Sequence, residues 1–142
     1  MKIAIGSDHA GFQLKKNIIN KFKYKINFKD VGTHSEDSVD YPDYAHLVAK
    51  ELISKNTERA ILICGSGNGI QMTVNKHKNV RCALCWNVEI AELARQHNNA
   101  NAISLPARFI NEDEAEKIVE AFIITEFEGG RHENRTKKIN AI

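Results

Sequence analysis

The sequence predicts an α/β protein in which helices cover both faces of a parallel sheet. Two observations lead to this fold class. Short apolar stretches suited to strands alternate with stretches of helical periodicity along all 142 residues, and this alternation is typical of parallel sheets. The strand candidates are also apolar throughout rather than at every second position, as expected when both faces are covered. We therefore expect a single domain spanning residues 1–142.

The first half of the chain is expected to contain three strands and two helices. Apolar side chains recur at helical spacing in the two longer stretches, and Pro42 falls in the first turn of the second one. The run at residues 60–64 is too short for a helix, so it indicates a buried strand. In order, the expected elements are the strand Ile3–Gly6, the helix Phe12–Phe22, the weaker strand Ile26–Val31, the helix Tyr41–Ile53 and the strand Ala60–Cys64.

The second half continues the alternation. Its clearest helix has Asn111 and Glu114 spaced as a capping box, followed by apolar residues in register. The expected elements are the helix Gly69–Lys76, the strand Val80–Cys85, the helix Glu89–His97, the strand Ala102–Leu105, the helix Asn111–Thr125 and a polar helix over about 131–140. Five strands with interleaved helices predict a three-layer α/β/α sandwich with a Rossmann-like five-stranded parallel sheet.

Composition excludes several classes of protein. The chain is 42% apolar and 27% charged, with a net charge of +2, so a nucleic-acid partner is not expected. No apolar run reaches the length of a membrane span, and the apolar stretch at the N-terminus is too short for a signal peptide. We expect a cytoplasmic protein with no membrane association. Its three cysteines are an odd number without disulfide spacing, which indicates free thiols in a reducing compartment.

Cys82 and Cys85 form a C-x-x-C pattern inside a predicted strand. Three strand steps separate the two residues by about 10 Å, which is too far for a disulfide. We therefore interpret both as packing residues.

The stretch Gly65–Gly69 follows a predicted buried strand and leads into a helix. Glycines let the backbone approach a ligand closely, and consecutive N–H groups can bind an anion. The loop matches neither the dinucleotide-binding nor the P-loop pattern. Two interpretations of it stay open, an anion-binding loop and a tight turn. Cys64, directly before it, is either a small buried residue or a thiolate stabilised by the loop.

Further candidate residues lie where the fold rule places ligands, outside the carboxyl ends of strands. Asp8 follows the first strand and either caps the next turn or faces the ligand, while His9 beside it could donate to a substrate. His97 and Asn98 lie at the end of a predicted helix, so they have either a structural role there or a role at the ligand site. Arg108, Arg131 and Arg135 are either a solvated basic face or a phosphate clamp. The histidines and cysteines do not have zinc-site spacing, and no metal or other cofactor is expected.

Six motifs in matching order resemble ribose-5-phosphate isomerase type B, of the ribose/galactose sugar-phosphate isomerase family. They span nearly the whole chain, and together they are specific although each one alone is weak. They are GSDHAG (Gly6–Gly11), DYPDYA (Asp40–Ala45), ICGSGNGI (Ile63–Ile70), NK…VR.A (Asn75–Ala83), RQHNNAN (Arg95–Asn101) and EGGRHENR (Glu128–Arg135).

The resemblance implies an enzyme of the pentose phosphate pathway that interconverts D-ribose 5-phosphate and D-ribulose 5-phosphate through a cis-enediolate, without a metal. It assigns Cys64 as the base and His97, with Asn98 beside it, to opening of the sugar ring. The backbone of Gly65, Gly67, Asn68 and Gly69, with Ser66, would stabilise the enediolate oxygen. Asp8 and Tyr41 would contact the sugar, and His9, Arg108, Arg131 and Arg135 would bind the phosphate. The resemblance also implies a homodimer, which could pair into a tetramer, with His97 reaching the partner's cysteine.

Two departures and two alternatives remain. Ser66 stands where threonine is common in the family, but the hydroxyl is kept. Trp86 lies outside the motifs, and we expect it to pack. An isomerase of a six-carbon sugar phosphate, such as allose or galactose 6-phosphate, is one alternative, although the intact RQHN favours the pentose enzymes. A flavodoxin-like nucleotide-binding module is the other, and the missing phosphate-loop patterns argue against it.

Overall fold

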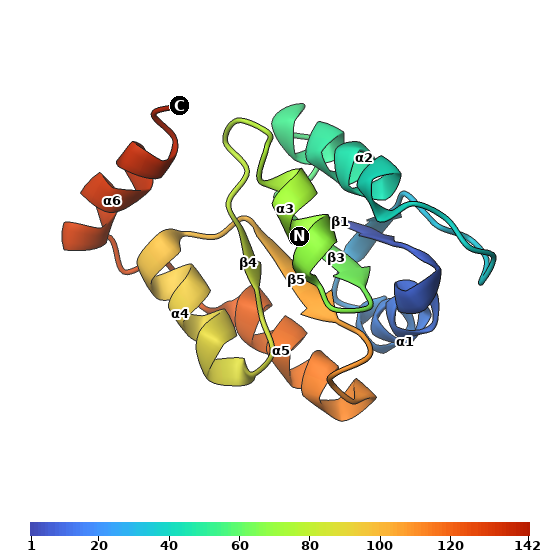
Figure 1. The fold of residues 1–142 in the computed structure, drawn as a ribbon. Coiled ribbons are helices and arrows are strands. Elements are labelled where there is room, and N and C mark those ends of the chain that lie inside the picture. Colours follow the sequence, from blue (N-terminus) through green and yellow to red (C-terminus); the bar gives the residue numbers. More distant parts are fainter.

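In the computed structural model, which describes residues 1–142, five parallel strands form one sheet in the order β2-β1-β3-β5-β4 (Figure 1). Every residue of the central strand β3 is buried. The strands are β1 (Lys2–Ser7), β2 (Asn27–Asp30), β3 (Arg59–Cys64), β4 (Cys82–Leu84) and β5 (Ala102–Pro106). The predicted α/β sandwich with a five-stranded parallel sheet is confirmed.

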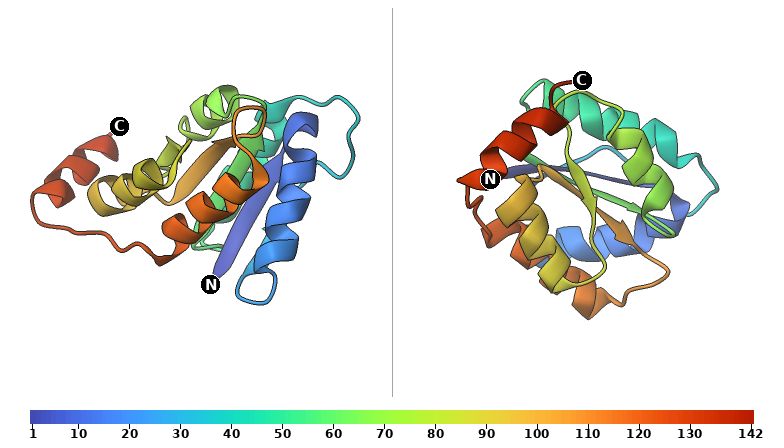
Figure 2. Two further views of the ribbon diagram at one scale, coloured as in Figure 1. Left: turned by 90° about the horizontal axis from the view of Figure 1, so that it is seen from below. Right: turned by 60° about the vertical axis from the view of Figure 1, so that its left-hand side comes forward.

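Helices cover both faces of this sheet (Figure 2). The core on one face includes residues of α1, α4 and α5, and the core on the other includes residues of α2 and α3. A last helix, α6, packs mainly against α4 and extends away from the sheet. The helical elements are η1 (His9–Gly11), α1 (Phe12–Phe22), α2 (Tyr41–Ile53), α3 (Asn68–Val74), α4 (Val88–Asn98), α5 (Glu112–Ile124) and α6 (Arg131–Ile139). None of them is both long and apolar enough to cross a bilayer.

Strand periodicity determines which layer each side chain of β3 enters. Ile61 and Ile63 belong to the core beneath α1, α4 and α5, whereas Leu62 and Cys64 belong to the core beneath α2 and α3. Successive side chains of a strand point to opposite faces, so Cys64 must share a face with Leu62. The thiol therefore lies at the carboxyl edge of the sheet, on the face that α3 covers.

Several element bounds differ from the sequence-based expectation. The strand expected over Val80–Cys85 is shorter, because the Arg81 N–H donates to the Asn101 side chain at 2.8 Å rather than to a strand. Helix α3 begins at Asn68, one residue earlier than expected. The capping box of Asn111 and Glu114 is present at the start of α5, as predicted.

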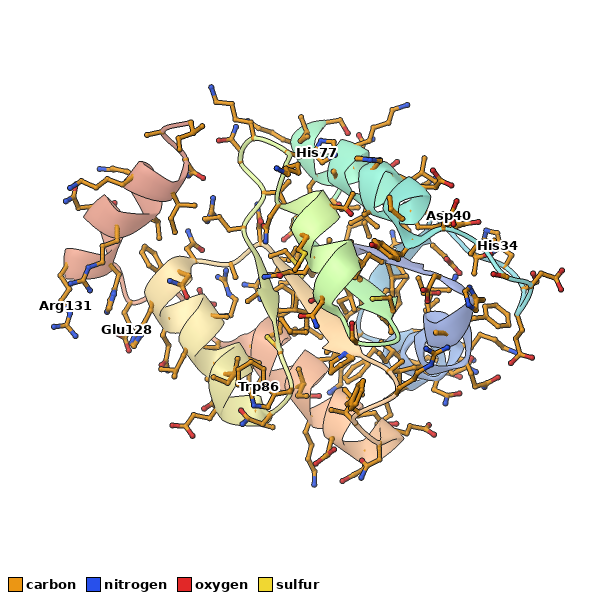
Figure 3. All side chains as sticks on the ribbon, viewed as in Figure 1. His34, Asp40, His77, Trp86, Glu128 and Arg131 are labelled. Atoms are coloured by element: carbon orange, nitrogen blue, oxygen red, sulfur yellow. The ribbon has the colours of Figure 1, made fainter.

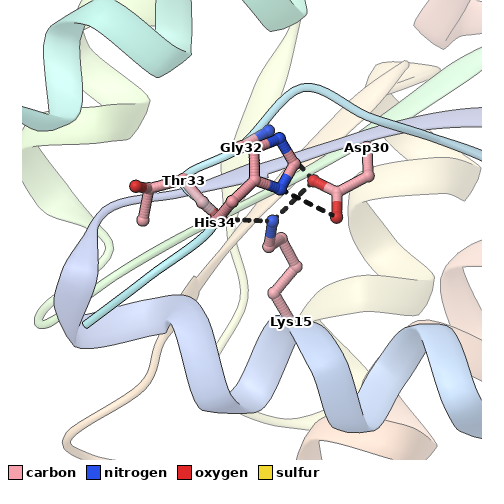
Figure 4. A network of polar contacts seen from close by, with 5 residues as sticks. All are labelled: Lys15, Asp30, Gly32, Thr33 and His34. Carbon is pink, nitrogen blue, oxygen red and sulfur yellow. Dashed lines mark hydrogen bonds and ion pairs between the residues drawn. The ribbon is translucent and has the colours of Figure 1, made fainter. Parts of the chain in front are cut away.

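Lys15 on α1 is fully buried and holds the chain that follows β2 (Figure 4). Its ammonium donates to Asp30 Oδ1 at 2.5 Å and to the Thr33 carbonyl at 2.7 Å. The Thr33 N–H donates in turn to the Ser7 carbonyl at 2.8 Å, at the carboxyl end of β1. The ion pair therefore connects α1 through this segment to the residue that precedes Asp8.

The three cysteines are free and buried, as the sequence predicted. Burial raises the pKa of the Cys85 thiol to about 12. Burial, together with the nearby Cys85, also raises the pKa of Cys82. Both thiols are therefore protonated and unreactive near neutral pH, which supports the packing interpretation of the C-x-x-C pattern.

Candidate active site

A cleft of about 480 Å³ lies at the carboxyl edge of the sheet, where the fold rule places a ligand. Residues that follow β1, β3 and β5 line it, together with the start of α2. Seven of the predicted site residues meet here, namely Asp8, Tyr41, Cys64, Gly65, Ser66, Gly69 and Arg108. Phe109 also lines the cleft; it was not among the predicted residues, and no motif in the sequence singles it out.

Two glycines of the loop after β3 are required by geometry. Gly67 has φ +75°, and a Cβ there would lie 2.5 Å from a methyl carbon of Leu84. A Cβ on Gly69 would lie 2.3 Å from the ring of Tyr41, which therefore packs directly against α3. The loop thus turns sharply and passes under Tyr41 because neither position carries a side chain.

The loop after β3 presents free hydrogen-bond donors, while the acceptors at its start are already occupied. The backbone N–H groups of Gly65, Ser66 and Gly67 donate to no acceptor in the chain. The carbonyl oxygens of Cys64 and Gly65 are occupied, since they accept from the N–H groups of Ala107 and Arg108 at 2.9 and 3.0 Å. Free N–H groups grouped in this way can stabilise a negatively charged oxygen.

Asp8 combines the two roles considered for it. Its carboxylate accepts from the Gly11 N–H at 3.1 Å and so caps the short turn η1. Its backbone N–H donates to the Ile63 carbonyl at 3.2 Å, which holds it beside Cys64. The side chain is buried yet lines the cleft, so its second oxygen is available to a hydroxyl of a ligand.

His9 lies next to this cleft without lining it. Its Nδ1 accepts from the Val39 N–H at 3.2 Å, so the proton of the neutral ring is on Nε2. The ring is thus held in place by the segment between β2 and α2, with a donor nitrogen free. The donor role expected for His9 stays a prediction.

Four predicted site residues do not reach the cleft within one chain. His97 and Asn98 lie at the end of α4, and Arg131 and Arg135 are exposed on α6. Glu128 and Arg131 lie close together at the junction of α4 and α6 (Figure 3). His97 instead stacks on His132, with ring centroids 4.2 Å apart. Burial, followed by the nearby His97 and Arg131, lowers the pKa of His132.

Two arginines that were given no role hold the end of α4 in position. Arg95 is buried and donates to the carbonyls of Ala100 and Thr125, at 2.6 and 3.1 Å. Arg81 donates to the carbonyls of Asn98 and Asn99. Both arginines belong to quoted motifs, so the signal was present, but side-chain direction cannot be read from one sequence.

Trp86 corrects an expectation. It was expected to pack, but it is 52% exposed, just before the start of α4 (Figure 3). The short strand β4 ends at Leu84, and Cys85 takes the buried position that follows it. Trp86 therefore falls on the solvent side, and it does not line the cleft.

The fold and the cleft together define a class: an α/β protein with a small cleft at the carboxyl edge of a parallel sheet, lined by a cysteine, backbone N–H donors and a buried carboxylate. Comparison with known proteins identifies the family within this class. A model of the ribose/galactose isomerase family matches residues 3–139. The chain is 47% identical over 141 residues to the probable ribose-5-phosphate isomerase B of Mycoplasma genitalium, covering 96% of this chain and 92% of that protein.

Other relatives agree. The chain is 39% identical to ribose-5-phosphate isomerase B of Escherichia coli over 142 residues, or 99% of this chain and 95% of that one. The crystal structure of the Thermotoga maritima ribose 5-phosphate isomerase superposes with a TM-score of 0.97 at 47% identity, over 99% of this chain and 98% of that one. The crystal structure of ribose-5-phosphate isomerase B from Mycoplasma genitalium with bound ribulose 5-phosphate superposes with a TM-score of 0.93 at 44% identity, over 98% of this chain and 93% of that one. This chain belongs to the ribose/galactose isomerase family.

Proposed function

We propose that this protein is an aldose–ketose isomerase that interconverts D-ribose 5-phosphate and D-ribulose 5-phosphate, a step of the pentose phosphate pathway. One observation supports this most strongly. Within a family of sugar isomerases, the cleft joins a cysteine to the unpaired backbone N–H groups of Gly65 and Ser66 and to a buried carboxylate. Isomerisation through an enediolate requires a base, a site for a negative oxygen and a partner for sugar hydroxyls.

In the proposed reaction the Cys64 thiolate removes the proton from C2 of the open-chain aldose. The electron pair moves to the carbonyl oxygen, which becomes the enediolate oxygen held by the N–H groups of Gly65–Gly67. The thiol then returns the proton to C1, and a hydroxyl proton passes from O2 to O1 to give the ketose. Each oxyanion donor contributes about 2.7–4 kcal/mol in enzymes of other families.

The phosphate and the closed ring need residues outside the single-chain cleft. We propose a homodimer in which α6 and the end of α4 of one chain approach the cleft of the partner. His97 would then open the sugar ring, and Arg131 and Arg135 would bind the phosphate with His9 and Arg108. The support is that α6 contacts little of its own chain beyond α4, while its arginines are exposed. A phosphate held away from the reacting carbons fixes the substrate in reactive alignment.

We also propose that the enzyme acts in the cytoplasm. Its three cysteines are free and buried, which is usual for proteins of reducing compartments.

A second candidate substrate class deserves a direct comparison, because the matching family model includes galactose isomerases. The test is a panel assay with ribose 5-phosphate, allose 6-phosphate and galactose 6-phosphate in the presence of a chelator. We expect the highest kcat/KM with ribose 5-phosphate. A higher value with a six-carbon substrate would reject the pentose assignment. Turnover of none of the three would reject the isomerase proposal, and thermal shift with nucleotides would then test the binding-module alternative.

A further inference from the structure

Three side chains with metal-binding atoms meet outside the cleft, where α4, the segment after α5 and α6 come together. His97 Nε2 lies 3.9 Å from Glu128 Oε2, and His132 Nε2 lies 3.7 Å from the same oxygen. All three ligand atoms lie within 4.8 Å of one another. Of the three residues, only His97 has a role in the proposed reaction, and that role does not explain the two neighbours grouped around it.

The backbone holds the three residues together independently of their side chains. The Glu128 N–H donates to the Gln96 carbonyl at 3.1 Å, which places Glu128 next to the last turn of α4. The His132 N–H donates to the Gly129 carbonyl at 3.1 Å in the turn that starts α6. Backbone hydrogen bonds therefore bring the three residues together without a ligand.

We propose that His97, Glu128 and His132 form a binding site for Zn²⁺. Imidazole and carboxylate are ligands that Zn²⁺ prefers, at metal–ligand distances of about 2.0–2.1 Å, so two ligands of a tetrahedral ion lie roughly 3.3 Å apart. The two separations between a histidine nitrogen and the carboxylate oxygen, 3.7 and 3.9 Å, exceed this by a few tenths of an ångström, and the two histidine nitrogens lie within 4.8 Å of each other. Three protein ligands leave the fourth position to water, as in open zinc sites.

Small movements suffice to complete the site. The imidazole rings of His97 and His132 are nearly parallel, at 13°, so a shared ion requires one ring to tilt. His97 and Glu128 have side chains 38% and 52% exposed and can move, whereas His132 is buried and fixed. Positive charge from Arg131 and Arg135 opposes the ion. We therefore expect reversible binding that is weaker than at structural zinc sites.

Zinc binding has a consequence that rests on the proposed function. Zn²⁺ bound to Nε2 of His97 takes up the lone pair that would accept a proton there and fixes the ring, so an occupied site is expected to block ring opening. Zn²⁺ would then inhibit an enzyme whose own chemistry needs no metal.

The binding test uses metal-free full-length protein, titrated with Zn²⁺ in a calorimeter. The variants are His132→Gln and Glu128→Gln, and the matched control is His46→Gln. His46 belongs to a different histidine pair, 2.7 Å from His77. We expect each of the two site variants to weaken binding at least about 10-fold, the lower end of the loss seen when even a hydrogen-bond partner of a metal ligand is removed. The control should bind as the wild type does.

Co²⁺ gives a second readout that does not depend on activity. Binding through two imidazoles and a carboxylate produces visible d–d bands without the near-ultraviolet charge-transfer band of a thiolate ligand. The proposal is overturned if the wild type does not bind submillimolar Zn²⁺, if a thiolate band appears, or if Glu128→Gln and His132→Gln both bind as the wild type does. Because the Glu128 side chain is half exposed, that variant remains informative if His132→Gln does not fold.

Inhibition is measured separately. Zn²⁺ should slow the turnover of ribose 5-phosphate by the wild type, chelator should restore it, and residual activity of Glu128→Gln should be insensitive. Zinc binding without any isomerase activity would reject the proposed function while supporting the site. Isomerase activity without zinc binding would reject the site alone.

Discussion

The cysteines of this chain differ in what surrounds them. Cys85 lies in the core beneath α1, α4 and α5, and its thiol is kept protonated by burial. Cys64 is also almost fully buried, but it ends β3 and borders the cleft beside three unpaired N–H groups. Burial alone therefore does not distinguish the proposed base, Cys64, from the cysteines of the core, whereas position relative to the sheet edge does.

Replacing Cys64 by alanine is expected to lower kcat for ribose 5-phosphate by about 10²–10⁴-fold, the range lost with a general base. The measurement is initial velocity at saturating substrate. Cys85→Ala is the matched control, since it removes another buried thiol far from the loop, and it should retain the wild-type kcat. Near-normal turnover by Cys64→Ala would show that another group is the base.

Gly67 and Gly129 provide a second comparison between single residues. Both have positive φ, at +75° and +68°, but a Cβ on Gly67 meets Leu84 whereas one on Gly129 meets nothing. Alanine at either position costs about 1–2 kcal/mol of backbone strain. The clash at Gly67 adds roughly 1–3 kcal/mol more. Urea denaturation of the two variants measures this difference, and equal destabilisation would contradict the role given to close packing.

At the scale of elements, Lys15 shows where a periodic pattern fails to identify a residue's role. The apolar residues of α1 indicate its buried face correctly, with Leu14, Ile18 and Phe22 inside. Lys15 is equally buried, because Asp30 and the Thr33 carbonyl accept from its ammonium. Its partners lie on a different element, so the sequence of the helix alone cannot predict this ion pair.

The two halves of this pair are expected to respond differently to substitution. The Lys15 side chain is 1% exposed and that of Asp30 is 32% exposed. Asp30→Asn leaves a buried ammonium without a counter-charge, which costs about 3–5 kcal/mol. Lys15→Met leaves a carboxylate that water can reach, so it should cost less. Chemical denaturation of both variants checks the order, and the reverse order would contradict it.

The strands and helices were more predictable than the way they assemble. Apolar runs located β1, β3 and β5, and the capping box located α5, because these signals are local. The strand order β2-β1-β3-β5-β4 depends on contacts between distant segments, and so does the shortening of β4 by the Asn101 side chain. Motifs led to six of the eight residues that line the cleft, but not to Arg108 or Phe109. No local signal showed that His97 and α6 lie away from it.

At the scale of the whole molecule, the proposed dimer predicts that two inactive variants regain activity when they are paired, which sites built within single chains would not allow. If each site combines Cys64 of one chain with His97 of the other, Cys64→Ala and His97→Gln proteins are each inactive. After they are unfolded together and refolded, random pairing makes half of the dimers mixed, each with one intact site, so about a quarter of wild-type activity returns. Activity is measured against each variant refolded alone. Failure to regain activity would place both residues in the same chain's site.

The pairing of β3 with the chain after β5 also influences which ligands the cleft can hold. The carbonyls of Cys64 and Gly65 are consumed by the N–H groups of Ala107 and Arg108, while the N–H groups of the loop itself stay free. That edge therefore presents hydrogen-bond donors, and it suits a ligand that presents hydrogen-bond acceptors. Carbonyl and enolate oxygens meet this demand, and so would a planar hydroxamate. A ligand whose edge carries only N–H or ammonium groups would find no free backbone acceptor at this edge, so it is expected to bind poorly whatever the side chains contribute.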